Sequence, residues 1–509
     1  MTDNLTHPYR CKSSSCIISQ RLLADPIRCT VGQVLTIDDL TDDVLLEIFH
    51  FYVDIYQDLD FHRFFTFRTT GKIESWQSLV HVCRRWRGLV FGSTRHLNLQ
   101  ICWYSHGRSA RNSLDVWPAL PLLILGSVSE ASVDNVIAGL EHSDRICQIK
   151  LHFSLFSPNQ KLWTAMEVPF PKLAALYLSG RSVVYGPVLP DSFLGGSAPR
   201  LRCFCLNAIS FPGLPKLLLS TTNLVTLYLL EIPQFGYISP EVMATCLSTL
   251  TSLKSLQLEF RYGQSYPGLK SRRPFPPIRS VLPTLAIFRF KGVNEYLEEF
   301  VARIDAPQLH RLSITFIIDI GFNTPELDRF IIRTPILGVY DEARLIFHGR
   351  KALVRLRQSH PESDHRMVEV EISCLKPHRQ FASLAQTCTS LLRLLLTLNL
   401  YIDGDPNSPF ILSDDVKNAD WLDLLLPFTA VKNLHLSQIF LPRIAFVLQE
   451  LAGRRTTEVL PALQSILLEG FQPSSPFLKG IEKFISARRL TNHPIAISAW
   501  DRDPVWDQF

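Results

Sequence analysis

Short stretches of alternating hydrophobic and polar residues recur along the chain from residue 170 onward. Each begins with a small or turn residue and continues as Leu-x-x-Leu-x-Leu or a close variant: PKLAALYLSG, PRLRCFCLNA, TNLVTLYLLE, TSLKSLQLEF, PTLAIFRFKG, PQLHRLSITF, TSLLRLLLTL, TAVKNLHLSQ and PALQSILLEG. Most neighbouring copies begin 23 to 32 residues apart, from Leu173 to Leu463. Alternate residues of a strand point to opposite faces, so each copy predicts a short strand with one buried face. The recurrence predicts a repeat protein.

The segments between copies have helical spacing of their apolar residues, as in SPEVMATCLSTL (239–250) and NEYLEEFVARI (294–304). LNLQICW (97–103) and ICQIKLHF (146–153) extend the strand pattern upstream, and ARLIFHG and MVEVEIS fit as degenerate copies in the gap between Leu309 and Leu391. No copy covers its own apolar faces, so the copies must stack. We expect an α/β fold: an irregular solenoid with parallel strands on the concave side and helices and loops outside. Trp500 and Trp506 either close its last face or form a partner-binding tail.

Two amphipathic helices precede the repeats. In the first, Val44, Leu45, Ile48, Phe49 and Tyr52 form an apolar stripe that follows Leu40; in the second, SLVHVCRRWRGLVF (78–91), the stripe is Leu79, Val82, Cys83, Trp86 and Val90. The expected organisation is a flexible tail over residues 1–34, a helical module over 35–95 with an insertion, and the solenoid with a C-terminal cap over 96–509. The basic, serine-containing tail is alternatively an organelle transit segment.

The motif Leu-x-x-Asp-Val-Leu-Leu-Glu-Ile-Phe (40–49), followed by Trp-x-x-Leu-Val-x-Val-Cys-Arg-x-Trp-Arg (76–87), resembles an F-box. Thr41 stands where that family usually has proline, and the insertion between the blocks is longer than usual. Joined to degenerate leucine-rich repeats, the chain is similar to the F-box proteins of fungi. The resemblance implies that the module docks on the adaptor Skp1, and through it a cullin, in a ubiquitin ligase for protein degradation. The implied adaptor-binding residues are Leu40, Val44, Leu45, Ile48, Phe49, Leu79, Val82, Cys83 and Trp86.

The same resemblance assigns a protein substrate to the repeats. The outward positions of successive strands form a ladder of Tyr177, Cys205, Tyr228, Gln257, Arg289, Ser313, Leu395, His435 and Leu467. This mixture of side chains suits a protein partner, and the expected substrate-binding residues are Tyr177, Tyr228, Gln257, Arg289 and His435. The alternatives are that loops cover this ladder, that the helical stripe packs on the first repeat, and that the chain is a leucine-rich-repeat scaffold outside any ligase.

The composition of the chain further narrows the class of protein. Hydrophobic residues at 46% and a net charge of +5 predict a folded protein without a strong field for nucleic acid or anionic lipid. Eleven cysteines without a Cys-x-x-Cys pair indicate reduced thiols. No apolar run approaches the roughly 18 to 20 residues of a membrane helix. We expect a soluble intracellular protein, cytoplasmic, nuclear or both, with no membrane and no nucleic acid among its partners.

Motifs for catalysis are weak. The sequence Gly-Gln-Ser-Tyr-Pro (263–267) lacks the second glycine of a nucleophile elbow, so a hydrolase using Ser265 would require a reactive serine in a proline-rich loop. The segment HPESDH (360–365) fits a solvated loop better than a metal site. The pairs Arg272–Arg273, Arg454–Arg455 and Arg488–Arg489 are expected on solvated surface. We expect a non-catalytic protein with no cofactor and no metal.

Overall fold

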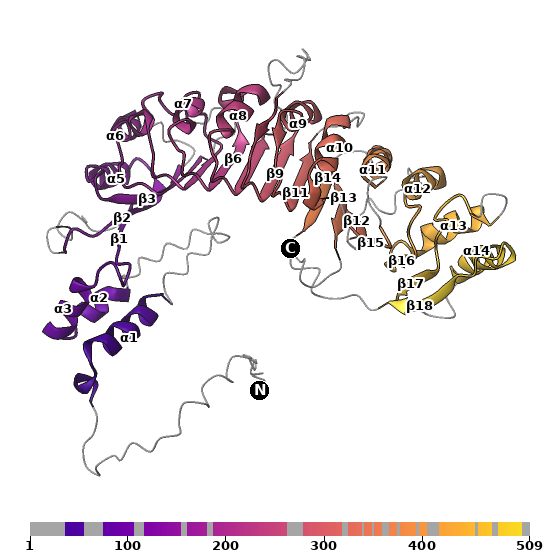
Figure 1. Cartoon of the computed structure of the whole chain (residues 1–509), viewed down its shortest axis with the longest axis horizontal. Coiled ribbons are helices and arrows are strands. Elements are labelled where there is room, and N and C mark those ends of the chain that lie inside the picture. Colours follow the sequence, from indigo (N-terminus) through magenta and orange to yellow (C-terminus); the bar gives the residue numbers. More distant parts are fainter. Residues whose placement is uncertain are drawn as a thin grey trace, which may run out of the picture. The chain divides into compact units, whose positions relative to one another are not determined.

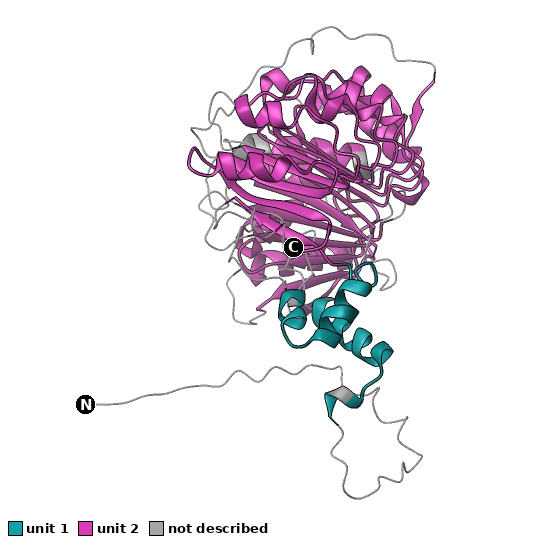
Figure 2. Ribbon diagram, turned by 90° about the vertical axis from the view of Figure 1, so that its left-hand side faces the viewer, with its two compact units in different colours: residues 1–63, 75–98 teal, residues 64–74, 99–509 magenta. Residues whose placement is uncertain are grey.

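The structure is a computed structural model of the whole chain. It describes residues 36–54, 75–105, 114, 117–153, 160–180, 187–261, 278–317, 324–337, 340–348, 351–358, 366–373, 377–392, 397–404, 417–452, 457–470 and 477–500. The chain divides into two compact units, residues 1–63 with 75–98 (unit 1) and residues 64–74 with 99–509 (unit 2) (Figure 2).

Unit 1 is a small helical module. Its elements are η1 (Ile37–Asp39), α1 (Asp42–Asp54), α2 (Ser75–Val80) and α3 (Arg84–Gly92). The expected continuous second helix is wrong, because the chain turns at His81–Cys83 and a new helix starts at Arg84. Cys83 has an extended backbone, and its Sγ accepts a hydrogen bond from Trp86 N at 3.4 Å, which is the geometry of an N-cap. Val82 and Cys83 therefore leave the apolar stripe.

Unit 2 is organised around one long sheet. Among the described residues it has 16 strands, in the order β1-β2-β3-β4-β5-β6-β7-β9-β11-β14-β13-β12-β15-β16-β17-β18. The strands are β1 (Ile101–Tyr104), β2 (Leu122–Val128), β3 (Ile146–Phe153), β4 (Ala175–Gly180), β5 (Cys203–Asn207), β6 (Thr226–Ile232), β7 (Ser255–Phe260), β9 (Ile287–Gly292), β11 (Arg311–Phe316), β12 (Glu342–His348), β13 (Lys351–Arg357), β14 (Met367–Ser373), β15 (Asn399–Gly404), β16 (Asn433–Leu436), β17 (Ser465–Glu469) and β18 (Ala496–Trp500). β8 (Ser280–Val281) and β10 (Ile304–Asp305) form a separate pair.

Helices cover one face of the long sheet (Figure 1). They are α5 (Val133–Leu140), α6 (Gln160–Ala165), α7 (Leu214–Leu218), α8 (Pro240–Leu247), α9 (Asn294–Val301), α10 (Pro325–Ile332), α11 (Pro377–Leu392), α12 (Asn418–Leu425), α13 (Leu441–Leu451) and α14 (Leu478–Leu490), with short turns η3 (Phe193–Gly196), η4 (Gln234–Gly236) and η5 (Pro335–Leu337). The opposite face of the sheet, free of these helices, is called the concave face below. The α/β solenoid expected from the repeats is confirmed.

The leucines of the repeated motif build the core between sheet and helices. Leu173, Leu176 and Leu178 of one copy are at most 1% exposed, and the equivalent residues of the next copies are buried in the same way. Just before each strand a backbone bond ties one copy to the previous one, as in Ala174 N to Cys147 O and Arg202 N to Ala174 O, each 2.8 Å. Burial and backbone pairing thus recur together, which is how a repeat stack holds its register.

The middle of the solenoid departs from the repeat pattern. ARLIFHG and MVEVEIS do form strands, but with β13 they make an antiparallel meander, β12–β13–β14, whose outer strands pair in parallel with β15 and β11. The segment TSLLRLLLTL was expected to be a strand beginning at Leu391, and this is wrong. Its start belongs to the end of α11, and the strand of that copy is β15. A short run rich in leucine fits the apolar spacing of a helix and that of a strand, so the pattern alone cannot separate the two there.

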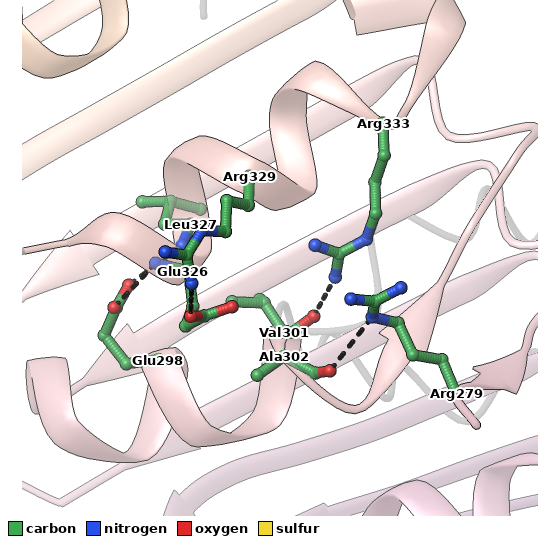
Figure 3. Close-up of polar contacts among 8 residues, drawn as sticks. All are labelled: Arg279, Glu298, Val301, Ala302, Glu326, Leu327, Arg329 and Arg333. Carbon is green, nitrogen blue, oxygen red and sulfur yellow. Dashed lines mark hydrogen bonds and ion pairs between the residues drawn. The ribbon is translucent and has the colours of Figure 1, made fainter. Parts of the chain in front are cut away.

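Polar contacts join successive helices on the outer side of unit 2 (Figure 3). The two carboxylate oxygens of Glu298 on α9 accept the backbone N–H groups of Glu326 and Leu327 at the start of α10, each at 2.9 Å. Burial raises the pKa of Glu298 to about 7, against the lowering effect of these two bonds. Arg333, at the end of α10, donates to Asp305 Oδ1 at 2.6 Å and to the carbonyl of Val301. Glu298 of α9 thus caps the start of α10, and Arg333 after α10 caps the end of α9.

Candidate interaction surfaces

Unit 1 has a core of its own. Leu45, Phe49 and Leu79 are 0%, 1% and 7% exposed, and the rings of Phe49 and Trp86 lie 4.7 Å apart. Sequence analysis placed these four side chains on the adaptor-facing surface. The structure differs, because three short helices can stabilise one another only by burying one apolar side of each. Leu45, Phe49 and Leu79 therefore hold the module together, and Trp86 is half-buried beside them.

A second apolar side of α1 faces solvent. Val44 and Ile48 are each 45% exposed, Phe51 is 71% exposed and Tyr52 is 36% exposed. Their spacing places them on a strip of the helix beside the buried one, and this set is called the α1 apolar strip. Val82, in the turn between α2 and α3, is also exposed, at 59%. Phe51 was missing from the sequence-derived site, although its position seven residues after Val44 is the signal that could have found it.

Arginine in unit 1 has an internal partner. Arg85 of α3 donates to Asp42 Oδ1 through Nε at 3.0 Å and Nη2 at 2.7 Å. The Arg85 Nη2 group also donates to the carbonyl of Leu40, which lies half-buried in the bend before α1. These contacts fix the start of α1 against α3. Arg85 is thereby engaged within the module.

The concave face carries the expected ladder in register. Tyr177, Cys205, Tyr228, Gln257, Arg289 and Ser313 are successive Cα partners across β4, β5, β6, β7, β9 and β11. Further along, His435 on β16 pairs with Tyr401 on β15 and with Leu467 on β17. Leu395 lies outside the described residues, and Tyr401 stands at that rung. Whether these residues bind a substrate stays a prediction.

The rungs differ in accessibility. Tyr177 and Cys205 are 8% and 9% exposed and pack with Leu230, against the half-buried Tyr228. Burial raises the pKa of the Tyr177 phenol, and burial together with the charge of Glu259 raises the pKa of Cys205 to about 12. Large side chains on adjacent strands shield one another, so this part of the ladder forms a small apolar cluster with little free surface.

Ion pairs form a band across the middle of the concave face. Lys291 Nζ lies 2.8 Å from Glu231 Oε1 and 3.7 Å from Glu259 Oε2. The neighbouring Gln257 donates to Glu259, so this predicted substrate contact is engaged within the face. Further along, Arg355 Nη2 lies 2.8 Å from Glu369 Oε2. Alternating charges give this band a polar surface that matches charged segments of a partner better than apolar ones.

An aromatic cluster ends the concave face. The rings of Tyr401 and His435 stack at 4.0 Å, and Trp500 lies 5.4 Å from His435 and 5.6 Å from Tyr401. The Arg344 guanidinium lies 5.2 Å from the Tyr401 ring. Burial, reinforced by the positive charge of Arg344, lowers the pKa of His435 to about 4. Trp500 lies on the last strand, β18, and its capping role stays a prediction, while Trp506 lies outside the described residues.

The candidate catalytic and metal-binding motifs of the sequence lie outside the described residues. No group of three His, Cys, Asp or Glu side chains there could hold a metal ion. Ser265, the segment 360–365 and the basic pairs at 272–273 and 454–455 lie outside the described residues. Arg488 was expected on solvated surface but is fully buried, and it donates to the carbonyls of Leu460 at 2.8 Å and Pro461 at 3.2 Å. Within the described ranges, no helix is long and apolar enough to cross a bilayer.

The fold defines the class as an α/β solenoid, built from strand–helix repeats and accompanied by a small helical unit. No protein-family model matches the sequence, and no curated protein matches it. Among solved structures, the crystal structure of the leucine-rich repeat-containing protein LegL7 from Legionella pneumophila is similar over 76% of this chain and 97% of that chain, with 14% identity and a TM-score of 0.29. These values are too low to carry an argument about function.

Proposed function

We propose that the chain is the substrate-recognition subunit of a Skp1–cullin–F-box ubiquitin ligase. Unit 1 docks the Skp1 adaptor, and the concave face of unit 2 holds the protein substrate. The chain contributes no catalytic residue. It raises the rate of ubiquitin transfer by keeping the substrate close to the charged conjugating enzyme, which converts an encounter in solution into a local one.

The observation that carries the proposal is the α1 apolar strip. Unit 1 buries Leu45, Phe49 and Leu79 as its own core and still exposes Val44, Ile48 and Phe51. Burying each of these exposed side chains against a partner contributes roughly 1.5–3 kcal/mol gross, against roughly 4–15 kcal/mol for lost rigid-body freedom. The gross gain from the three side chains, roughly 4.5–9 kcal/mol, lies within the range of this cost, so a stable heterodimer also requires polar contacts from the partner at the rim.

Coelution of the purified full chain with Skp1 in gel filtration tests the adaptor half of the proposal. The informative variant is Ile48→Asp with Val82→Asp, because both side chains are exposed and the module keeps its core. Substituting Leu45 would unfold unit 1 and lose binding for a trivial reason. The matched control is Leu490→Asp, an 89% exposed leucine at the end of α14 in unit 2.

The expected result is coelution for the wild type and for Leu490→Asp, and none for the double variant. Absence of coelution for the wild type, or unchanged coelution for the double variant, would contradict the proposal. Circular dichroism of all three proteins checks that they are equally folded.

A leucine-rich-repeat scaffold outside any ligase is the second candidate. The burial of Leu45, Phe49 and Leu79 favours it, because these side chains satisfy one another without a partner. In this case unit 1 acts as an end cap, and removing residues 1–92 lowers the stability of the repeats themselves. The ligase proposal instead predicts that the truncated chain keeps its repeat stability and loses only Skp1. Thermal unfolding of the full and truncated chains, followed by circular dichroism, separates the two.

A further inference from the structure

Two arginines on the concave face have no ion-pair or hydrogen-bond partner within the described part of the chain. Arg289 lies on β9 and Arg311 on β11, the next strand of the sheet. Ser313 is the Cα partner of Arg289, so Arg311 is offset from Arg289 by two residues and projects from the same face. Both side chains are half-buried. Neither has a carboxylate within 4.0 Å or a hydrogen-bond acceptor among the described residues.

The other basic side chains of this part of the face are all engaged. Those with a carboxylate within 4.0 Å are Lys291, Arg344, Lys351, Arg355 and Arg357. The acidic group that acts most strongly on Arg311 is Glu369, and it already accepts from Arg355 Nε at 2.8 Å and from Ser313 Oγ at 3.3 Å. Each of these cations thus has at least one carboxylate within 4.0 Å, whereas Arg289 and Arg311 have none among the described residues.

The arrangement is electrostatically unfavourable in the isolated chain. Partial burial and the nearby charges of Arg289 and Arg355 lower the pKa of Arg311, while Glu369 opposes the effect. A guanidinium keeps its charge under such conditions, so the chain holds two like charges together at reduced hydration. An anion placed between or over them would remove this cost and occupy donors that the fold leaves unused.

We propose that Arg289 and Arg311 bind two carboxylates of an acidic, extended segment of the partner protein that lies on the concave face. The inference deepens the proposed function of that face and does not depend on the adaptor. With strands about 4.8 Å apart and a two-residue offset of about 6.7 Å, the two Cα atoms lie about 8 Å apart. Alternate side chains of an extended peptide are about 6.7 Å apart. An acidic-x-acidic sequence thus places one carboxylate over each guanidinium, where a bidentate contact is possible.

The full-length protein is titrated into three fluorescein-labelled peptides, with binding followed by fluorescence anisotropy. One alternates glutamate with serine, the second replaces every glutamate with glutamine, and the third is the glutamine peptide with a single phosphoserine. Arg289→Gln and Arg311→Gln remove one cation each. Arg200→Gln, an exposed arginine in the turn before β5, is the matched control for net charge.

The glutamate peptide is expected to bind at least tenfold more tightly than the glutamine peptide. Each of Arg289→Gln and Arg311→Gln weakens it about tenfold, while Arg200→Gln has no effect beyond a small change from net charge. Equal affinity for the glutamate and glutamine peptides would overturn the proposal, as would unchanged binding by the two variants. Binding of the phosphoserine peptide alone would overturn the choice of carboxylates.

Thermal unfolding of the same variants separates recognition from a structural role. Removing one of two unpaired cations relieves repulsion, so Arg289→Gln and Arg311→Gln should unfold at the same temperature as the wild type or higher. A fall in unfolding temperature without a change in peptide affinity would assign these residues to structure and overturn the inference. Coelution with Skp1 is independent of all these results, so failure here and failure of the adaptor proposal are distinguishable.

Discussion

Replacing Glu298 with glutamine tests the link between α9 and α10 most directly. In the wild type, each carboxylate oxygen of Glu298 accepts one backbone N–H of α10, at 2.9 Å from Glu326 N and from Leu327 N. The Glu298→Gln side chain keeps one oxygen acceptor, while its amide nitrogen cannot accept the second N–H. The substitution therefore removes one charge-assisted bond and the buried charge together.

The structure sets the sign and the size of the effect. Burial raises the folded-state pKa of Glu298 to about 7 from its ordinary 4.5, with the charges of Glu326 and Asp328 adding to it. The ionised carboxylate thus costs stability above about pH 7, and the cost disappears as the pH falls to the unfolded value. A pKa difference of this size corresponds to about 3 kcal/mol, which solvent screening at a partly exposed group reduces to about 1–2 kcal/mol.

Hydrogen exchange followed by mass spectrometry, on peptides covering α10 (Pro325–Ile332), measures this locally. After correction for intrinsic exchange rates, α10 of the wild type should become more protected by about 1–2 kcal/mol as the pH falls from 7 to 4.5. The Glu298→Gln variant should show a smaller trend, because only Asp328 of α10, whose pKa burial raises to about 6, then contributes to it. Glu295→Gln, an exposed acid of the same helix as Glu298, should behave as the wild type. Identical trends in wild type and Glu298→Gln would refute the reasoning.

Three further predictions concern other parts of the chain. The pKa of His435 is about 4 in the folded state against 6.5 in the unfolded state, so its contribution to the free energy of unfolding is complete above pH 6.5 and is lost by pH 4. In urea unfolding, His435→Phe should reduce the loss of stability at acid pH by about 1–2 kcal/mol. Gly126→Ala would place a Cβ 2.1 Å from Ser105 Oγ at a φ of +135°. The free energy of unfolding should fall by several kcal/mol, and thermal unfolding should occur at a clearly lower temperature. Phe49→Ala removes the ring beside Trp86 and should weaken unit 1 by about 3 kcal/mol. Limited proteolysis should then cut unit 1 faster and leave the repeats unchanged; equal loss in both units would contradict this.

Much of the solenoid could be predicted from the sequence. The leucines of each copy alternate with outward residues, and a one-residue slip would have exposed Leu176 and Leu178, so the register from Tyr177 to Ser313 followed from the pattern. The same pattern could not reveal whether a strand runs parallel or antiparallel to its neighbour. An antiparallel strand alternates just as a parallel one does, so KALVRLR and MVEVEIS carried no sign that the chain reverses there.

The helical module was predicted less well. A helical stripe through Leu79, Val82 and Trp86 assumed an unbroken helix, whereas Cys83 ends one helix and caps the next. The side that α1 buries was also ambiguous, because Val44, Leu45, Ile48 and Phe49 are all apolar and span both sides. Which of two adjacent apolar strips faces inward depends on the neighbouring helices, and this information lies in packing rather than in the periodicity of one segment.

The reversed order β14–β13–β12 affects how a nascent chain can complete the sheet. In most solenoids each repeat contacts only the repeats next to it in the sequence. Here the native neighbour of β11 is β14, the last strand of the meander to leave the ribosome, while β12 is synthesised first. The edge of β11 therefore stays unpaired until residue 373 has emerged, and β15 enters the sheet only by pairing with β12. The strands before and after the meander become one continuous sheet only when β12, β13 and β14 have paired. While residues 340–373 are being translated, the unpaired edge of β11 can mispair with another strand.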